Sequence, residues 1–341
     1  MNQNHEQSLC YDDVLLVPKF SEIKSRSEID ISTTIGSNID LSLPVISSPM
    51  DTVSETAMAD AMGAAGGCAI VHRYNSIEIQ REIITNSTAT NIGAAVGTTG
   101  DYLERAIAAH EVGANIICVD VAHGHHILMR DALHSLRNHF GDELHIMAGN
   151  VATLEGINDL SDWGANSVRC NIGGGSICST RIQTGHGVPG LQTIIDCAKT
   201  NKDVSIIADG GIKNSGDIVK ALAAGADAVM VGSMLAGTNQ TPGDIYRDNN
   251  GVKWKTYRGM ASKDAQINWR GTYASLEGVT AKVPFRGCVT EVLTDIERGI
   301  RSGFSYSGAR DLKNLWARCE FIRQTNAGMS ESRTHIKTRN P

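Results

Sequence analysis

The chain has 341 residues and a formal net charge of −6, and it contains no Lys/Arg run of the kind that marks a nucleic-acid-binding surface. Its length suits one large domain of α/β-barrel size, and its charge argues against nucleic acid as a main partner. The polar N-terminus and the absence of an apolar stretch of about eighteen residues predict no membrane segment. Eight cysteines without paired C-x-x-C spacing predict reduced thiols and a cytoplasmic protein.

Eight short apolar runs rich in Val and Ile recur along the chain, with helical spacing between them. Continuous hydrophobicity is typical of strands buried on both faces, and intervening helices imply parallel pairing. The expected strands are 43–47, 68–71, 92–96, 116–119, 145–148, 167–170, 204–208 and 228–231. Expected helices are 56–65, 102–112, 154–163, 191–200 and 215–224, several of which end in Gly-Ala, a helix C-cap pattern. We therefore predict a (β/α)₈ TIM barrel, with residues 1–341 forming a single domain.

Four features are expected after the eighth strand. Residues 249–251 (Asn-Asn-Gly) predict a hairpin turn. Residues 261–280 are polar with little periodicity and predict a mobile flap. Amphipathic helices are expected over 289–302 and 309–323. The polar tail, 326–341, is expected to be ordered only by a neighbouring subunit.

The candidate chemistry centres on residues 173–181 (GGGSICSTR), which follow the sixth expected strand. Glycines allow close approach to a ligand, and Cys178 is then a candidate nucleophile, although a buried structural cysteine is the plain alternative. Barrel enzymes place their active site at the carboxyl ends of the strands and bind phosphate after strands seven and eight. Those loops contain 209–211 (Asp-Gly-Gly) and 232–233 (Gly-Ser). Cys178 therefore lies on the expected catalytic rim.

Other polar residues at the ends of expected strands are further candidates for the site. Asp209 can accept both hydroxyls of a ribose, because the next helix is expected to begin only near 214 or 215. Asp51 and Asp120 occupy similar positions and predict a polar ligand that reaches across the barrel mouth. The histidines of 123–126 (HGHH) are a weak metal signal without carboxylates at ligand spacing. Arg73 and Glu277 are kept as further candidates.

With these residues assembled, the chain resembles the IMP dehydrogenase and GMP reductase family along nearly its whole length. The matching stretches are 11–18 (YDDVLLVP), 48–53 (SPMDTV), 148–151 (AGNV), 176–181 (SICSTR), 208–211 (ADGG), 231–234 (VGSM) and 257–260 (YRGM). Two departures occur in the catalytic loop, where Gly174 replaces the usual proline and Ser179 replaces the usual threonine. Loss of the proline is expected to loosen the loop.

The resemblance implies roles for individual residues. Cys178 adds as thiolate to C2 of the purine, while Thr180 and Glu277 transfer protons. The implied substrate-binding residues are Met50, Ser176, Asp209, Gly211, Gly232, Ser233, Tyr257, Gly259 and Met260. The implied cofactor-binding residues are Asp120, Ala122 and Arg73. A monovalent cation such as K⁺ is implied at Gly173, Gly175 and Cys178, and the assembly is expected to be a homotetramer.

The resemblance leaves two activities and one binding function open. We predict a GMP reductase that converts GMP to IMP and ammonia with NADPH, since the 73–91 connection is too short for the regulatory module common in dehydrogenases. Between Met260 and Glu277, Arg270 and Tyr273 are also separated, whereas dehydrogenases use an adjacent Arg-Tyr pair to activate water. The alternative is an IMP dehydrogenase that uses NAD, favoured by 54–55 (SE) and the tail 331–335 (ESRTH). A nucleotide-binding barrel without turnover is the third hypothesis.

Overall fold

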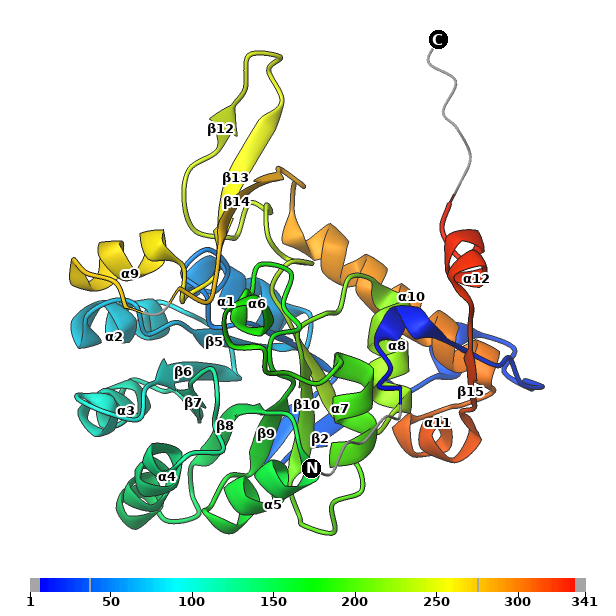
Figure 1. Ribbon diagram of the computed structural model, residues 1–341, viewed down its shortest axis with the longest axis horizontal. Coiled ribbons are helices and arrows are strands. Elements are labelled where there is room, and N and C mark those ends of the chain that lie inside the picture. The colour runs from blue at the N-terminus through cyan, green and yellow to red at the C-terminus, as the bar shows by residue number, and fades with distance from the viewer. Residues whose placement is uncertain (1–6, 37, 275, 335–341) are drawn as a thin grey trace.

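The computed structural model describes residues 7–36, 38–274 and 276–334. Eight parallel strands form a closed barrel in which each strand pairs with its neighbours in the chain and the last pairs with the first (Figure 1). The barrel strands are β4 (Val45–Ser47), β5 (Cys68–Val71), β6 (Ile92–Val96), β7 (Ile116–Asp120), β8 (His145–Val151), β9 (Ser167–Cys170), β10 (Ser205–Asp209) and β11 (Ala228–Val231). The predicted (β/α)₈ barrel and its eight strands are confirmed.

One principal helix follows each barrel strand and packs outside it. These helices are α1 (Thr56–Ala64), α2 (Ile77–Thr85), α3 (Tyr102–Glu111), α4 (Ile127–Phe140), α5 (Leu154–Asp162), α7 (Gly190–Cys197), α8 (Ser215–Ala223) and α10 (Val289–Ser307). A short extra helix, α6 (Thr180–Thr184), begins two residues after Cys178. The Gly-Ala prediction is confirmed, because Gly113, Gly164 and Gly225 have φ of 106°, 110° and 112° directly after their helices.

The N-terminal segment closes the amino end of the barrel. It comprises η1 (Tyr11–Asp13), β1 (Val14–Leu16), η2 (Arg26–Glu28), β2 (Thr33–Ile35) and β3 (Ile39–Leu41). The β2–β3 hairpin places Ile35, Ile39 and Leu41 in one apolar cluster with inward residues of the barrel strands. Gly36 at its turn donates its N–H to Oγ of Ser205, the first residue of β10, at 2.9 Å. The opposite, carboxyl end is left for a ligand site.

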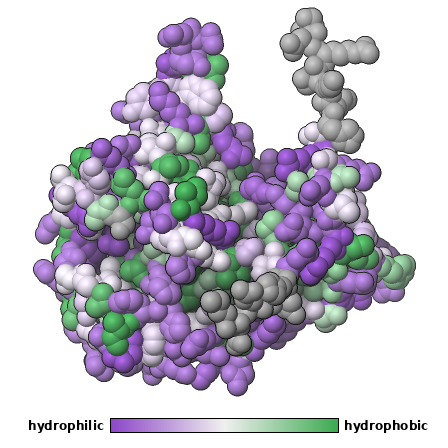
Figure 2. Space-filling model, viewed as in Figure 1, coloured by the Kyte–Doolittle hydropathy of each residue, from purple (hydrophilic) through white to green (hydrophobic). Residues whose placement is uncertain are grey.

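A three-stranded antiparallel sheet follows the barrel and contains β12 (Tyr246–Arg247), β13 (Lys253–Arg258) and β14 (Thr280–Pro284). The β12–β13 hairpin confirms the turn predicted at 249–251 and projects from the body as a finger (Figure 1). Figure 2 shows that mainly hydrophilic side chains cover this finger. Helix α9 (Lys263–Arg270) lies in the flap, where no helix was expected. Ser262 caps it by accepting the Ala265 N–H at 3.3 Å.

The C-terminal expectations need correction. The helix predicted over 309–323 is instead α11 (Leu312–Arg318) followed by β15 (Phe321–Arg323), because Cys319 is extended and β15 pairs antiparallel with β1. Part of the polar tail forms α12 (Asn326–Glu331), whose Thr325 cap accepts the Gly328 N–H at 3.2 Å within the same chain. Residues 335–341 of the predicted tail lie outside the described residues.

Among the helices of the described segments, none combines the length and the apolar character that crossing a membrane requires.

Candidate active site

A cavity of about 290 Å³ opens at the carboxyl ends of the barrel strands. Every residue to which the family resemblance assigns a role in binding substrate, cofactor or cation, or in catalysis, lines this one cavity. These residues are Met50, Arg73, Asp120, Ala122, Gly173, Gly175, Ser176, Cys178, Thr180, Asp209, Gly211, Gly232, Ser233, Tyr257, Gly259, Met260 and Glu277. Their roles remain predictions, but the fold brings together residues that lie as much as 227 positions apart in the chain, from Met50 to Glu277.

Three of these side chains form a hydrogen-bonded chain. The Cys178 thiol donates to Thr180 Oγ1 at 3.2 Å, and the Thr180 hydroxyl donates to Glu277 Oε2 at 2.7 Å. Cys178 precedes α6 and Thr180 is its first residue, whereas Glu277 comes from the flap. The arrangement connects a nucleophile to a carboxylate through one hydroxyl, a path along which a proton can pass.

Backbone hydrogen bonds hold the flap against the catalytic loop. Val279 N–H donates to Ile177 O at 3.0 Å, and Ser179 N–H donates to Glu277 O at 2.8 Å. On the other side, Gly259 N–H donates to Val279 O at 3.1 Å. Residues 277–279 of the flap therefore lie between the catalytic loop and the end of β13, and these hydrogen bonds fix where Glu277 enters the cavity.

Arg181 braces the glycine-rich loop. Its Nε donates to Ile172 O at 3.0 Å and its Nη2 donates to Val188 O at 2.6 Å. The side chain fills the space beside Gly173, where an added Cβ would lie 2.5 Å from Arg181 Cγ. Arg181 thus ties the start of the loop that lacks the family's proline to the segment after α6.

The end of the cavity where phosphate is expected to bind is tightly packed. A Cβ on Gly232 would lie 2.9 Å from Tyr257 Oη and 3.0 Å from Met50 Sδ. Gly211 has φ of 79°, a conformation that side-chain-bearing residues rarely adopt. Burial raises the pKa of Tyr257 to about 12, so its hydroxyl is a neutral hydrogen-bond donor at physiological pH.

Asp209 ends β10 and points its carboxylate into a charged cluster. Asn150 Nδ2 donates to Asp209 Oδ2 at 2.9 Å, and Arg169 Nη1 lies 3.7 Å from the same oxygen. Burial raises the pKa of Asp209 above its ordinary value, against the opposing effects of Arg169 and Asn150. The expectation that Asp209 does not cap the following helix is confirmed, since Asn214 caps α8.

A second cavity of about 410 Å³ adjoins the first and shares Arg73, Tyr74, Val121 and Ala261 with it. Trp269 of α9 stacks on Tyr74, with ring centroids 4.3 Å apart and 27° between the planes. The Arg73 guanidinium lies 5.6 Å from the centroid of each ring. Arg73 Nη2 also donates to the backbone oxygen of Asp120 at 3.3 Å. Two connected cavities can take a substrate and a longer second ligand side by side.

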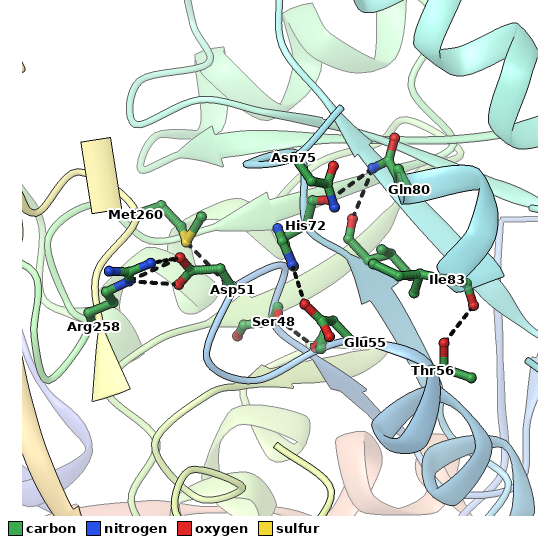
Figure 3. Close-up of polar contacts among 12 residues, drawn as sticks. Ser48, Asp51, Glu55, Thr56, His72, Asn75, Gln80, Ile83, Arg258 and Met260 are labelled. Carbon is green, nitrogen blue, oxygen red and sulfur yellow. Dashed lines mark hydrogen bonds and ion pairs between the residues drawn. The ribbon is translucent and has the colours of Figure 1, made fainter. Parts of the chain in front are cut away.

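Some strand-end residues serve the scaffold instead. Asp51 does not line the cavity, because Arg258 binds its carboxylate through Nε at 3.0 Å and Nη2 at 2.5 Å (Figure 3). The Asp51 N–H faces Met260 Sδ at 3.4 Å, so this loop positions a predicted base-binding residue (Figure 3). The prediction that Asp51 faces a ligand across the barrel mouth is wrong.

The histidines of 123–126 are also dispersed. His125 Nε2 lies 2.8 Å from Asp159 Oδ2, and His126 caps α4 by accepting the Leu128 N–H at 3.1 Å. Across the described residues, no three His, Cys, Asp or Glu side chains gather where they could hold a metal ion.

Sequence reasoning missed several residues that line the two cavities. Four of them come from different elements or loops: Asn150, Arg169, Tyr74 and Trp269. Because these residues are far apart in the chain, the sequence does not show that they lie close together. Asn150 had a signal, since it lies in the 148–151 motif, and so did Tyr74, which directly follows the candidate Arg73 in a family-like stretch. For Arg169 and Trp269, we find none in the pattern of the sequence.

Comparisons with known proteins identify the family. Residues 8–335 match the model of the IMP dehydrogenase / GMP reductase domain. The chain is 32% identical to an inosine-5'-monophosphate dehydrogenase of Nitrosopumilus maritimus (97% of this chain, 98% of that one) and 30% identical to a GMP reductase of Leishmania major (96% and 97%). A crystal structure of a Trypanosoma brucei GMP reductase variant with guanosine 5'-monophosphate superimposes with a TM-score of 0.94 at 29% identity, covering 98% of this chain and 99% of that one.

These relatives also bear on the short 73–91 connection. The alignments with the N. maritimus dehydrogenase and the L. major reductase extend over 470 and 477 positions, far more than the 341 residues present here. Both named activities therefore occur in relatives with additional sequence, and the missing module does not distinguish them. The barrel, the motifs at its carboxyl end and the match over residues 8–335 together show that the chain belongs to the IMP dehydrogenase / GMP reductase family, whose members are oxidoreductases acting on purine nucleotides.

Proposed function

We propose that this protein is a GMP reductase that converts GMP to IMP and ammonia with NADPH. The observation that carries the proposal is the chain from Cys178 through Thr180 to Glu277, in a cavity that lacks the water-activating pair of the dehydrogenases. Such a relay can deliver protons to a departing amino group, whereas hydrolysis of an adduct needs a base that activates water.

The flap residues that would supply that base lie elsewhere. Arg270 lines the second cavity, where its Nη2 donates to Gln266 Oε1 at 2.5 Å and its guanidinium lies 5.4 Å from the Trp269 centroid. Tyr273 is 48% exposed, and Lys263 Nζ lies 4.8 Å from its ring centroid. Neither residue lines the cavity that contains Cys178. This placement supports reduction over hydrolysis.

The proposed chemistry assigns one task to each residue. The Cys178 thiol transfers its proton through Thr180 to Glu277 and adds as thiolate to purine C2. The same relay returns a proton to the exocyclic amino group, which leaves as ammonia and yields a covalent purine adduct. When bound, NADPH would supply a hydride to C2. Cleavage of the carbon–sulfur bond would then release IMP and leave Cys178 as thiolate, which takes one proton from solvent to regenerate the thiol.

The residues present fit a dinucleotide cofactor. Arg73 Nε is buried without a hydrogen-bond partner among the described residues, although Asp120 Oδ2 lies 4.0 Å away, and this donor lies where the two cavities meet. We place the nicotinamide end beside Cys178, its ribose near Asp120 and Ala122, and the rest of the cofactor in the second cavity. Arg73 supplies positive charge there for an anionic ligand.

Two further parts of the proposal follow the family resemblance. The backbone oxygens of Gly173, Gly175 and Cys178 are the proposed ligands of a monovalent cation, and Gly175 O already accepts the Cys178 N–H at 3.1 Å. The proposed assembly is a cytoplasmic homotetramer. Activity in K⁺ against Na⁺ and the mass measured by light scattering test these two points.

Absorbance at the reduced-nicotinamide band tests the proposed function. Purified protein with GMP and NADPH is expected to lose this absorbance and to release one ammonia per cofactor oxidised. A gain of absorbance with IMP, NAD and K⁺, and no loss with GMP, would identify a dehydrogenase instead. Tight GMP binding without any absorbance change would identify a barrel that binds nucleotide without turnover.

A further inference from the structure

Arg169 occupies an unusual position beneath the cavity. It lies on β9, its side chain is 3% exposed, and its guanidinium is shared between the carboxylates that end two other strands. Nη2 forms an ion pair with Asp120 of β7, and Nη1 lies 3.7 Å from Asp209 Oδ2 of β10. Nη1 also contacts Met230 Sδ at 3.7 Å. One buried cation therefore touches both carboxylates that face the cavity from the strand ends.

Arg169 affects the charge state of Asp209. The side chains of Asp120 and Asp209 are only 21% and 18% exposed, so water screens their repulsion poorly. Burial and the nearby Asp120 raise the pKa of Asp209, whereas Arg169 and the amide of Asn150 lower it. Burial opposes the charge of Arg169, but its acidic neighbours hold the pKa of Arg169 above its ordinary value. Arg169 is thus charged, and its charge favours ionised Asp209.

The other titratable groups that face Asp209 are uncharged near neutral pH. They are Tyr11, Tyr257, Cys118 and Cys170. Burial raises the pKa of the first three, and a hydrogen bond with Cys197 together with burial raises that of Cys170. Changes in the charge of Asp209 near neutrality therefore depend on Arg169 and Asp120.

We propose that Arg169 is a positioning residue that fixes the carboxylates of Asp120 and Asp209 relative to each other and so couples the cofactor site to the nucleotide site. This inference rests on the proposed function, in which Asp209 binds the nucleotide ribose and Asp120 lies near the cofactor ribose. The planar guanidinium presents separate donors to the two carboxylates, whereas a lysine ammonium is a point charge that cannot hold both in one plane. A ligand that shifts one carboxylate moves the shared cation and changes the environment of the other.

The test compares Arg169→Met with Arg169→Lys, with GMP binding measured by calorimetry from pH 5.5 to 8.5, with and without NADP⁺. GMP and NADP⁺ cannot react together, so binding is measured free of turnover. In Arg169→Met, GMP binding is expected to weaken by roughly tenfold or more at low pH and to recover as pH rises. The reason is that Asp209, without the charge of Arg169, ionises only at a higher pH. The GMP phosphate also titrates in this range, and dividing each variant's GMP affinity by the wild-type affinity at the same pH cancels that effect. Arg169→Lys is expected to restore the pH profile but not the effect of NADP⁺ on GMP affinity.

Two further variants keep the test decisive. Asp120→Asn removes a negative neighbour of Asp209, so GMP binding is expected to persist to lower pH than in wild type, the opposite shift. Arg137→Met removes a guanidinium that donates to Gly164 O at 2.7 Å, remote from the cavity, and is expected to leave the pH profile of GMP binding unchanged. If Arg169→Met does not fold, Arg169→Lys and Asp120→Asn decide the question.

Unchanged GMP affinity and an unchanged NADP⁺ effect in the folded Arg169 variants would overturn the inference about Arg169 alone. Failure of the wild-type protein to bind GMP would instead overturn the proposed function. The two failures are therefore distinguishable within one set of binding curves.

Discussion

At the scale of single residues, the site joins a cysteine, a threonine and a glutamate in one hydrogen-bonded chain, the proposed nucleophile and proton relay. Cys178 is a cysteine whose thiol donates to a hydroxyl in the cavity, in contrast to the fully buried Cys68, whose pKa burial raises to about 12. A buried thiol of that kind stays protonated and inert. The contact with Thr180 and the access to the cavity support the proposed role of Cys178 as the reactive cysteine.

The first prediction concerns this nucleophile. Cys178→Ala is expected to abolish turnover while leaving GMP binding largely intact, because the thiol is the proposed nucleophile but supplies little of the binding surface. Steady-state absorbance and calorimetry on the same preparation measure the two effects. Turnover near the wild-type rate would rule out the covalent mechanism.

A second prediction concerns the relay. Glu277→Gln is expected to lower kcat by roughly a hundredfold or more, because the amide keeps the shape but cannot accept the Thr180 proton. Thr180→Val is expected to cause a similar loss, and the double variant is expected to be little worse than either single variant, since the two act in series. Multiplicative losses in the double variant would show that the residues act independently.

At the scale of secondary-structure elements, the flap performs two tasks with two different segments. Helix α9 reaches the second cavity through Trp269, and the segment between α9 and β14 places Glu277 in the first. The polar composition of 261–280 concealed the helix, because its few buried contacts, such as Ala265 and Gln266, do not produce an apolar stripe. Packing of Trp269 on Tyr74 is a tertiary contact that stabilises α9 and that the local sequence does not predict.

The third prediction addresses this contact. Trp269→Ala is expected to raise the KM for cofactor several-fold, because the lost stack is worth about 1 kcal/mol and lines the second cavity. GMP affinity measured by calorimetry is expected to stay within about twofold of wild type. Tyr273→Ala, on the same flap but exposed, serves as the matched control and is expected to change neither value. A large loss of activity in Tyr273→Ala would instead support a role for this residue in activating water.

At the scale of the whole molecule, the two ends of the barrel differ in polarity and in task. The carboxyl end gathers the charged and glycine-rich residues of the site, and the amino end is sealed by the β2–β3 hairpin. Beside that seal, His145 is 1% exposed and its Nε2 lies 2.8 Å from Ser167 Oγ. Burial, aided by the nearby Arg137 charge, lowers the pKa of His145 to about 3.

The fourth prediction follows from this buried histidine. Its folded pKa lies below the unfolded value of about 6.5, so the unfolded chain binds the proton more tightly. His145 therefore contributes stability that is present above about pH 6.5 and is lost as pH falls toward 3. His145→Gln is expected to flatten the decline of unfolding free energy between pH 6 and 4 by up to about 1.4 kcal/mol per pH unit.

Urea unfolding of both proteins at several pH values provides the measurement. Burial raises the pKa of Asp227 to about 6, and its contribution is lost as pH rises through that value, but this carboxyl is common to both proteins and cancels in the difference. Parallel stability curves for wild type and variant would show that His145 does not titrate in this way.

The barrel was predictable because its signal is local and repeated. Each strand is a continuous apolar run that must be buried on both faces, and each Gly-Ala pair ends a helix with a glycine that can adopt positive φ. The predicted site residues converge for the same reason, since parallel strands place all their carboxyl ends at one end of the barrel. Resemblance of the motifs to a known family then named their roles.

Long-range pairing was decided only by the tertiary structure. Residues 321–323 continue a helical pattern locally, yet they pair with Val14–Leu16 because the N-terminal segment presents an open strand edge there. Asp51 and Asp120 look alike as strand-end carboxylates, but Arg258 binds the first while Arg169 binds the second beside the cavity. The sequence by itself determined the barrel and which residues lie at the carboxyl ends of its strands, since both depend on local burial and strand direction. Which charges pair, and which carboxylate remains to meet a ligand, depends on distances between segments that only the folded chain brings together.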